Sequence, residues 1–181
     1  LLDQNLGCDA EDYSNLVPDN CRVLVGPENA LLRPQFAAAR LAALSRRRNC
    51  SRIERILVSL GATDPNNVTG WVIDVLEHCG TEAEIDVILG AHAPHLDAVN
   101  EALRKKIPWA KLHTGVANVA DMMAVADLAI GAAGSTSWER CCLGLPALLV
   151  VLADNQEANA RELARAGVVE LVGHGDDLDR L

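Results

Sequence analysis

Aromatic residues are scarce in this chain of 181 residues, which has one Phe, one Tyr and three Trp. So few rings argue against the stacking platforms on which single-stranded nucleic acids bind. Basic residues are also in the minority, and the formal net charge is −9. The one basic cluster, Arg46 to Arg48, lacks flanking aromatics or glycines, so we interpret it as a solvated linker rather than an anion site. Without an extended positive surface, nucleic acid is not an expected partner.

Metal-binding spacings are absent. The six cysteines form neither a C-x-x-C motif nor a Cys/His group of the zinc-binding kind. His92 and His95 flank a Gly/Pro loop without a third ligand, so we interpret them as surface residues. We therefore expect reduced thiols, no metal and no other cofactor.

Long apolar runs and a signal peptide are missing as well. The longest apolar stretch, near Ala147 to Ala153, is far short of the ~20 residues that span a bilayer. A cytoplasmic protein without a membrane span is expected. Half of the residues are hydrophobic, mostly Leu, Val, Ile and Ala, and this composition suits parallel strands covered by helices on both faces.

From Arg55 onward, short β-branched runs alternate with longer helical patterns. This alternation is typical of repeated βα units and predicts an α/β fold with a Rossmann-like, doubly wound parallel sheet of about six strands. The expected strands are Arg55–Ser59, Ile85–Leu89, Lys111–Thr114, Leu128–Gly131, Ala147–Val151 and Val168–Val172. The expected helices are Asn67–Cys79, Leu96–Lys106, Val119–Ala126, Ser135–Leu143 and Gln156–Ala166. In such a sheet the βα loops lie at the carboxyl ends of the strands, where ligands bind.

The first fifty residues do not continue this rhythm. Val23 to Pro27 predicts a single strand and turn, and Arg33 to Arg48 predicts a helix and basic linker. We therefore assign residues 1–50 to the tail of a preceding domain and its linker, and residues 51–181 to the ligand-binding domain. Gly175 to Leu181 resembles the start of a helix that does not proceed, so we expect the domain to be truncated there and the chain to be a piece of something longer.

The most informative segment is Leu128 to Glu139, where a strand runs into a small-residue turn and then into a helix. Free backbone N–H groups and the positive end of the helix dipole meet at such a turn, which suits a phosphate. Small residues such as Gly134 let the backbone approach the anion, and the hydroxyls of Ser135, Thr136 or Ser137 can add donors.

Glu139 falls one turn inside that helix, about 6 Å along the axis from Ser135 at a rise of 1.5 Å per residue. Its carboxylate can accept both ribose hydroxyls of a nucleotide whose phosphates lie at the helix start. Alternatively, Ser135 merely caps the helix and Glu139 is an ordinary surface acid. The local pattern alone leaves both interpretations open.

A second glycine-containing loop, Ser59 to Asn67, also leaves a strand and enters a helix. It would place backbone amides, including those of Gly61 and Thr63, at the same edge of the sheet. It is also a βα turn with Asp64 as N-cap and Pro65 at the first helical position, which is compatible with ligand contact.

A third loop follows the fifth strand, where Gln156 and Asn159 stand three apart on one helix face. Amides at that spacing can hydrogen-bond sugar hydroxyls and phosphate oxygens, although such a pair is also a common cap. No Ser/His/Asp series or carboxylate pair stands out, so the sequence predicts binding and identifies no general base.

Motifs along nearly the whole chain resemble those of the UDP-2,4-diacetamido-2,4,6-trideoxy-β-L-altropyranose hydrolases of pseudaminic acid biosynthesis. They are Asp3 to Gly7, Gly26 to Arg33, Leu57 to Asn67, Gly131 to Pro146, and Asn155-Gln156. The segment from Ala129 to Pro146 is the most specific of them. Ala62 and Asn29 depart from the pattern, because the family tends to have glycine and tyrosine there.

The resemblance implies the GT-B fold, similar to the N-acetylglucosaminyltransferase that makes lipid II, with UDP-sugar held chiefly by the C-terminal of two Rossmann-like domains. It implies metal-independent hydrolysis at the anomeric carbon, with inversion and release of UDP.

Site roles also follow from the resemblance. Glu139 would hold the ribose, and Ser135 and Thr136 the diphosphate. Backbone groups of the loop that contains Val116 and Asn118 would meet the uracil. Asn155 and Gln156 would face the sugar.

The family's general base, a histidine near the N-terminus of the whole enzyme, has no counterpart here. The expected partners are thus UDP or a UDP-sugar and an N-terminal domain of the same polypeptide, and the isolated chain is expected to be inactive. A GT-B glycosyltransferase donor domain and a non-catalytic nucleotide-sugar-binding module are the alternatives.

Overall fold

A computed structural model describes residues 1–175 of the chain. Its centre is a six-stranded sheet in which all neighbouring strands are parallel, in the order β5-β4-β3-β6-β7-β8. The strands are β3 (Arg55–Ser59), β4 (Glu84–Leu89), β5 (Lys111–Thr114), β6 (Leu128–Ala132), β7 (Ala147–Val151) and β8 (Glu170–His174). The predicted Rossmann-like sheet is confirmed, and the strand order reverses between β3 and β6.

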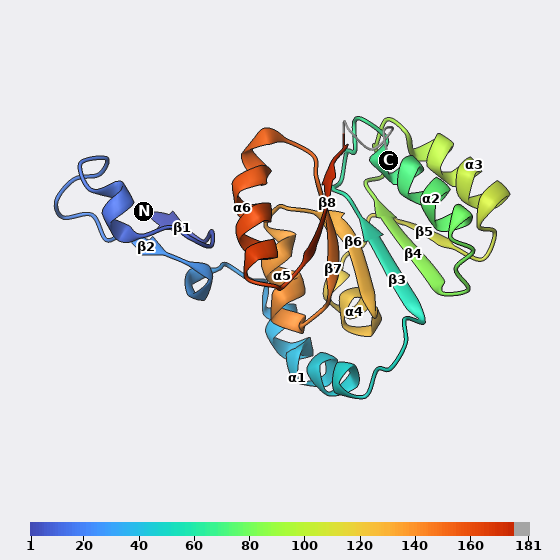
Figure 1. The fold of residues 1–181 in the computed structure, drawn as a ribbon, viewed down its shortest axis with the longest axis horizontal. Coiled ribbons are helices and arrows are strands. Elements are labelled where there is room, and N and C mark those ends of the chain that lie inside the picture. Colours follow the sequence, from blue (N-terminus) through green and yellow to red (C-terminus); the bar gives the residue numbers. More distant parts are fainter. Residues whose placement is uncertain (176–181) are drawn as a thin grey trace.

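Helices cover both faces of this sheet (Figure 1). Alternate side chains of each strand point to opposite faces, so Ile56 and Val58 join one apolar core while Leu57 joins the other. The first core is closed by α2 (Val68–His78) and α3 (Leu96–Lys106). The second is closed by α1 (Pro34–Arg48), α4 (Val119–Val125), α5 (Thr136–Leu143) and α6 (Asp154–Arg165).

Helix α1, which we assigned to the linker, packs against α4 and α5 of the α/β unit. Phe36 and Ala43 on this helix are fully buried in the second core. The interpretation of Arg46 to Arg48 as a solvated linker is wrong for its first two residues. Arg46 pairs with buried Asp127, and Nη2 of Arg47 donates hydrogen bonds to the carbonyl oxygens of Met123 and Ala126 at 2.6 and 3.0 Å.

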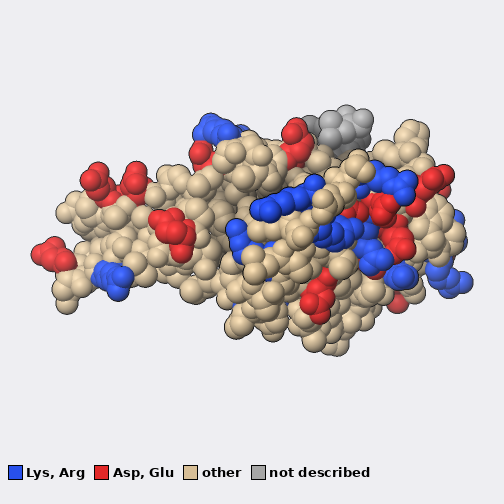
Figure 2. All heavy atoms as spheres, turned by 90° about the horizontal axis from the view of Figure 1, so that it is seen from below, with Lys and Arg blue, Asp and Glu red and all other residues tan. Residues whose placement is uncertain are grey.

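The amino ends of the strands point down in Figure 1, and Figure 2 shows the molecule from that side. Lys and Arg side chains are interspersed there with Asp and Glu. Several of them form ion pairs, such as Arg55 with Glu84 and Arg52 with Glu54. This face is therefore of mixed charge and offers no continuous positive patch.

The N-terminal segment extends away from the sheet (Figure 1). It contains a short parallel pair, β1 (Leu2–Asp3) with β2 (Leu24–Val25), and the 3-10 turns η1 (Ala10–Tyr13) and η2 (Pro27–Asn29). Strand β2 lies within the predicted Val23–Pro27 element, whereas β1 was not predicted. No helix within residues 1–175 has the length and apolar character of a membrane span.

Element boundaries agree with the sequence prediction to within two residues. The largest shifts are of two residues, at β8, which begins at Glu170 instead of Val168, and at α6, which begins at Asp154 instead of Gln156. Val168 instead lies in the turn that ends α6, where its N–H donates to the carbonyl oxygen of Leu163 at 3.2 Å after Gly167 turns with φ +70°. The helix start expected from Asp176 to Leu181 lies outside the described residues.

Candidate functional site

The loops that carry the predicted site residues all follow carboxyl ends of strands in the one parallel sheet. Those after β3 and β6 are direct neighbours, because these two strands pair with each other, and the loop after β7 is next to them. The loop after β5 leads into α4, which packs beside α5. The sheet order therefore places the predicted residues along one edge, around the point where the strand order reverses.

The turn between β6 and α5 has unused backbone donors. Ser135 is the N-cap of α5, but its hydroxyl makes no capping hydrogen bond, and the residue is exposed. Over residues 1–175, the amides of Gly134, Ser135 and Thr136 have no backbone or side-chain acceptor. The interpretation of Ser135 as a simple capping residue is thus not supported, and the helix start presents three N–H groups to an anion.

Glu139 lies one turn into α5, with its side chain 15% exposed. Its Oε1 accepts hydrogen bonds from Nε and Nη2 of Arg33, at 3.3 and 3.0 Å. Arg33 precedes α1, and its guanidinium stacks over the ring of buried Phe36, 5.1 Å from the centroid. This ion pair joins residues 106 positions apart and holds the Glu139 carboxylate beside the start of α5.

Two contacts with the chain that follows β4 support the loop after β3. The N–H of Gly90 donates to the carbonyl oxygen of Ala62 at 2.9 Å, and Nε2 of His95 lies 2.9 Å from the carbonyl oxygen of Pro65. Gly61 adopts φ +106° and, like Thr63, is exposed. Both predicted binding residues therefore lie on the outer side of a supported loop.

Asp64 caps α2, although not as predicted. The helix begins at Val68 with Asn67 as its N-cap residue, so Pro65 is not its first residue. The Asp64 carboxylate is buried and reaches forward to accept from the amides of Val68 and Thr69, at 2.9 and 2.8 Å. The reason is the left-handed backbone of Asp64 and Asn67, which inserts a turn before the helix.

The amides after β7 separate into two environments. Oε1 of Gln156 accepts from the N–H of Leu152 at 3.1 Å, so this side chain caps its own loop. Asn155 and Asn159 instead line a cavity of about 450 Å³ between α6 and the segment from Asn5 to Cys8. Gln156 and Asn159, three apart in the sequence, therefore do not share one cavity.

The loop after β5 contains Val116 and Asn118, both half-buried. Nδ2 of Asn118 donates to Oδ2 of Asp121 at 2.6 Å, while its Oδ1 is buried and has no partner within the described residues. Gly115 opens this loop with φ +64°. The backbone here is available for the uracil contact that we predict.

The sequence analysis missed Arg140, the residue after Glu139. It is 2% exposed and lies directly below the β6–α5 turn, where its Nη2 donates to the carbonyl oxygen of Ala132 at 2.7 Å. The sequence signal that could have identified it is a charged residue at a position on the buried face of a helix.

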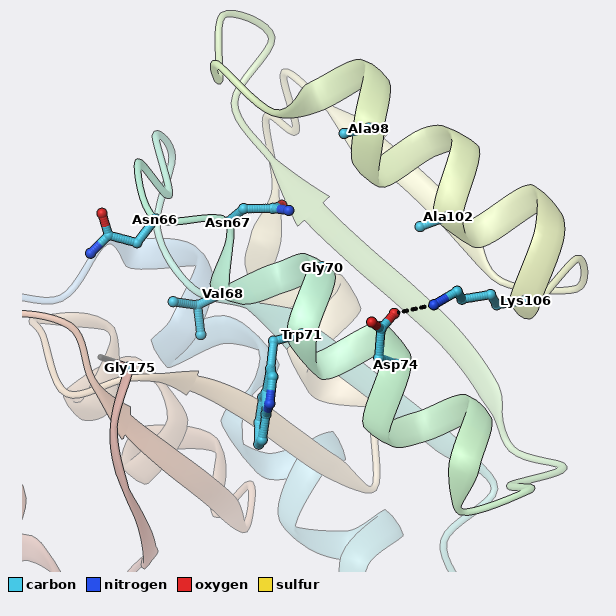
Figure 3. Close-up of a pocket in the computed structure, with 10 residues that line it drawn as sticks. All are labelled: Asn66, Asn67, Val68, Gly70, Trp71, Asp74, Ala98, Ala102, Lys106 and Gly175. Carbon is cyan, nitrogen blue, oxygen red and sulfur yellow. Dashed lines mark hydrogen bonds and ion pairs between the residues drawn. The ribbon is translucent and has the colours of Figure 1, made fainter. Parts of the chain in front are cut away.

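A separate groove of about 440 Å³ lies along α2 and α3. Figure 3 shows Trp71 and Asp74 of α2 on it, with Asp74 paired to Lys106 of α3. Its helical walls carry Gly70, Ala98 and Ala102, and the loops after β6 and β7 do not line it. Within residues 1–175, no group of three His, Cys, Asp or Glu side chains is placed to hold a metal.

The fold and these loops can be compared with known proteins. Residues 56–176 match the model of the glycosyltransferase family 28 C-terminal domain. This chain belongs to that family. The family 28 domain begins at β3 and thus includes all six strands of the sheet and the loops that carry most of the predicted site.

Relatives of this family 28 domain are longer proteins. The chain is 30% identical over 162 residues to the spore coat polysaccharide biosynthesis protein SpsG of Bacillus subtilis, covering 88% of this chain and 46% of that protein. It is 32% identical over 133 residues to an uncharacterised protein of Methanocaldococcus jannaschii, covering 72% of this chain and 27% of that protein. The chain thus spans less than half the length of these curated relatives.

Solved structures with the same fold are glycosyltransferase-like. MurG of Acinetobacter baumannii superposes with a TM-score of 0.67 at 16% identity, over 99% of this chain and 55% of that chain. The glycotransferase of kitacinnamycin gives a TM-score of 0.52 at 17% identity, over 68% and 31%. The family 28 domain described here therefore has the fold of a GT-B C-terminal domain.

Proposed function

We propose that this family 28 domain is the UDP-binding half of an inverting UDP-sugar hydrolase that releases UDP and a free diacetamido-trideoxy sugar in pseudaminic acid biosynthesis. The observation that carries the proposal is the start of α5, where three unused amides lie one turn from the Glu139 carboxylate. The similarity to a spore coat polysaccharide biosynthesis protein supports a role in making a surface sugar.

In the proposed reaction, this domain binds the leaving group. The amides of Gly134, Ser135 and Thr136 hold the diphosphate, and their preorganised dipoles stabilise the negative charge that grows on it as the anomeric C–O bond breaks. Glu139 accepts the ribose hydroxyls. Asn155 faces the sugar, as does Gln156 through its Nε2, since its Oε1 accepts from the N–H of Leu152. The water is activated by a group of the other domain.

A glycosyltransferase is the second candidate, because the matching family is one of glycosyltransferase domains. The two functions differ only in the acceptor, which is water for the hydrolase and a hydroxyl compound for the transferase. When the full-length protein is given radiolabelled UDP-sugar, our proposal predicts label in free sugar at a rate that added acceptors do not change. Label in a larger product would instead identify a transferase.

The nucleotide site itself can be tested on this chain by calorimetry with UDP, UMP and CMP. We expect UDP to bind more tightly than either monophosphate, and Glu139→Ala to weaken UDP binding by about tenfold, the loss expected for a charged hydrogen bond. Glu101→Ala is the matched control, because it also removes a glutamate from an ion pair, here with Lys105 on the remote helix α3.

If wild type and Glu139→Ala bind UDP with equal affinity, Glu139 is not part of the nucleotide site. Equal affinities for UMP and CMP would remove the base specificity on which the assignment to a UDP-sugar depends.

A further inference from the structure

Arg140 is a buried cation with little hydrogen bonding. Its Nη2 donates to the carbonyl oxygen of Ala132 at 2.7 Å and to the hydroxyl of Ser137 at 3.0 Å. Its Nε is also buried and has no partner within the described residues. One donor group of a buried guanidinium is thus left unsatisfied, beside the turn that presents the amides of Gly134 to Thr136.

Gly131 shows where this guanidinium lies. A Cβ on Gly131 would collide with Nη1 of Arg140 and would approach the carbonyl oxygen of Ser59 to 3.1 Å. Gly131 is in β6, and Ser59 is its pairing partner at the end of β3. The guanidinium therefore lies against the carboxyl ends of these two strands, in space that a side chain at residue 131 would occupy.

The charge of Arg140 has no counter-ion of its own. No carboxylate of residues 1–175 lies within 4 Å of its guanidinium, and the adjacent Glu139 pairs with Arg33 instead. Burial lowers the pKa of Arg140 to about 10, so the side chain still carries its charge at neutral pH. An unpaired buried cation is costly for a fold, and that cost is offset when an anion binds nearby.

We propose that Arg140 is a positioning residue for the diphosphate, whose negative charge is the counter-charge of this buried guanidinium. The guanidinium also holds the Ala132 carbonyl and the Ser137 hydroxyl away from the anion, so that the β6–α5 turn presents only N–H groups. This inference rests on the proposed nucleotide site and deepens it.

Arg47 provides a matched control. Its Nη2 also donates to two oxygens, the carbonyls of Met123 and Ala126, and its Nε, like that of Arg140, is buried without a partner in the described part of the chain, as is its Nη1. It is attached to the end of α1, beside the turn that leads into the amino end of β6, and so lies at the opposite edge of the sheet. Loss of Arg47 should affect stability without affecting a diphosphate.

The test compares the affinities for UDP and uridine, measured by calorimetry with uridine determined by displacement. In Arg140→Met we expect UDP binding to weaken by about tenfold while uridine binding changes by less than about twofold. Arg140→Lys, which keeps the charge, should retain most of the UDP affinity. Arg47→Met should lower the thermal midpoint and leave the ratio of the two affinities unchanged.

If Arg140→Met does not fold, Arg140→Gln replaces it, since an amide can still donate to Ala132. The inference is overturned if the ratio of the UDP and uridine affinities stays at the wild-type value in the neutral variant. It is also overturned if both affinities fall by the same factor. Failure of the wild-type chain to bind UDP is a different result, because it overturns the proposed nucleotide site as a whole.

Discussion

Asp127 joins three parts of the chain at the amino edge of the sheet. Its side chain is 1% exposed, and it accepts hydrogen bonds from the amides of Glu54 and Arg55, both at 2.9 Å, from the Cys50 thiol at 3.2 Å and from Arg46. Burial by itself would raise the pKa of this carboxyl, but the hydrogen bonds from Arg46, the two amides and Cys50 together hold it well below its usual range.

Replacement of Asp127 by Asn should therefore destabilise the fold by about 2–4 kcal/mol at pH 7, because it leaves a half-buried Arg46 and two amides without a charged acceptor. A group with a lowered folded pKa contributes its full stability above its unfolded pKa of about 4 and loses it as the pH falls through the folded value. Urea unfolding between pH 7 and pH 2 measures both effects.

The wild-type free energy of unfolding should fall through this acidic range, and that of Asp127→Asn should fall less. Glu101→Gln, in an exposed pair with Lys105, is the control and should match wild type at pH 7. Parallel pH profiles for wild type and Asp127→Asn would contradict the role of this carboxylate.

At the scale of elements, the loop after β3 depends on the loop after β4. Gly90 has no side chain, and its backbone lies directly against the carbonyl of Ala62. This contact fixes the position of the segment that carries Gly61 and Thr63 at the edge of the sheet.

Gly90→Ala should lower the free energy of unfolding by about 1–3 kcal/mol, because the new Cβ would collide with the Ala62 carbonyl oxygen and displace the loop. Thermal unfolding measures the change. Gly134→Ala is the control, because a Cβ there meets no atom within 4 Å of the described residues and the backbone of Gly134 has no positive φ. An equal loss of unfolding free energy in Gly90→Ala and Gly134→Ala would contradict the prediction. It would show that the structure accommodates the new Cβ at residue 90 without a specific free-energy cost.

The strands and helices were largely predictable from the sequence. Runs such as Arg55–Ser59 and Ala147–Val151 are short, β-branched and bounded by turn residues, so local pattern and tertiary structure agree. β1 escaped prediction because a two-residue strand has no periodicity. We assigned helix α1 to a linker because the basic residues at its end do not indicate that the helix packs on the sheet. The burial of Phe36 in the core depends on residues far away in the sequence.

At the scale of the whole molecule, the sheet order decides which loops meet. The sequence predicted the individual loops at the carboxyl edge, and the order β5-β4-β3-β6-β7-β8 makes those after β3 and β6 neighbours. Long-range side-chain pairs were not predictable, since Arg46 and Asp127 are 81 positions apart and Arg33 and Glu139 are 106 apart. Arg140 escaped for the same reason, because its burial follows from the packing of α5 onto β6.

The proposed nucleotide site depends on binding of a diphosphate by the amides at the start of α5. The most direct test is a titration of the ¹⁵N-labelled chain with UDP, followed through amide chemical shifts. We expect the largest changes at Gly134, Ser135 and Thr136, with smaller ones in the loop around Gly61. Changes confined to the groove along α2 and α3, at residues such as Trp71, or no change at saturating UDP, would contradict the claim.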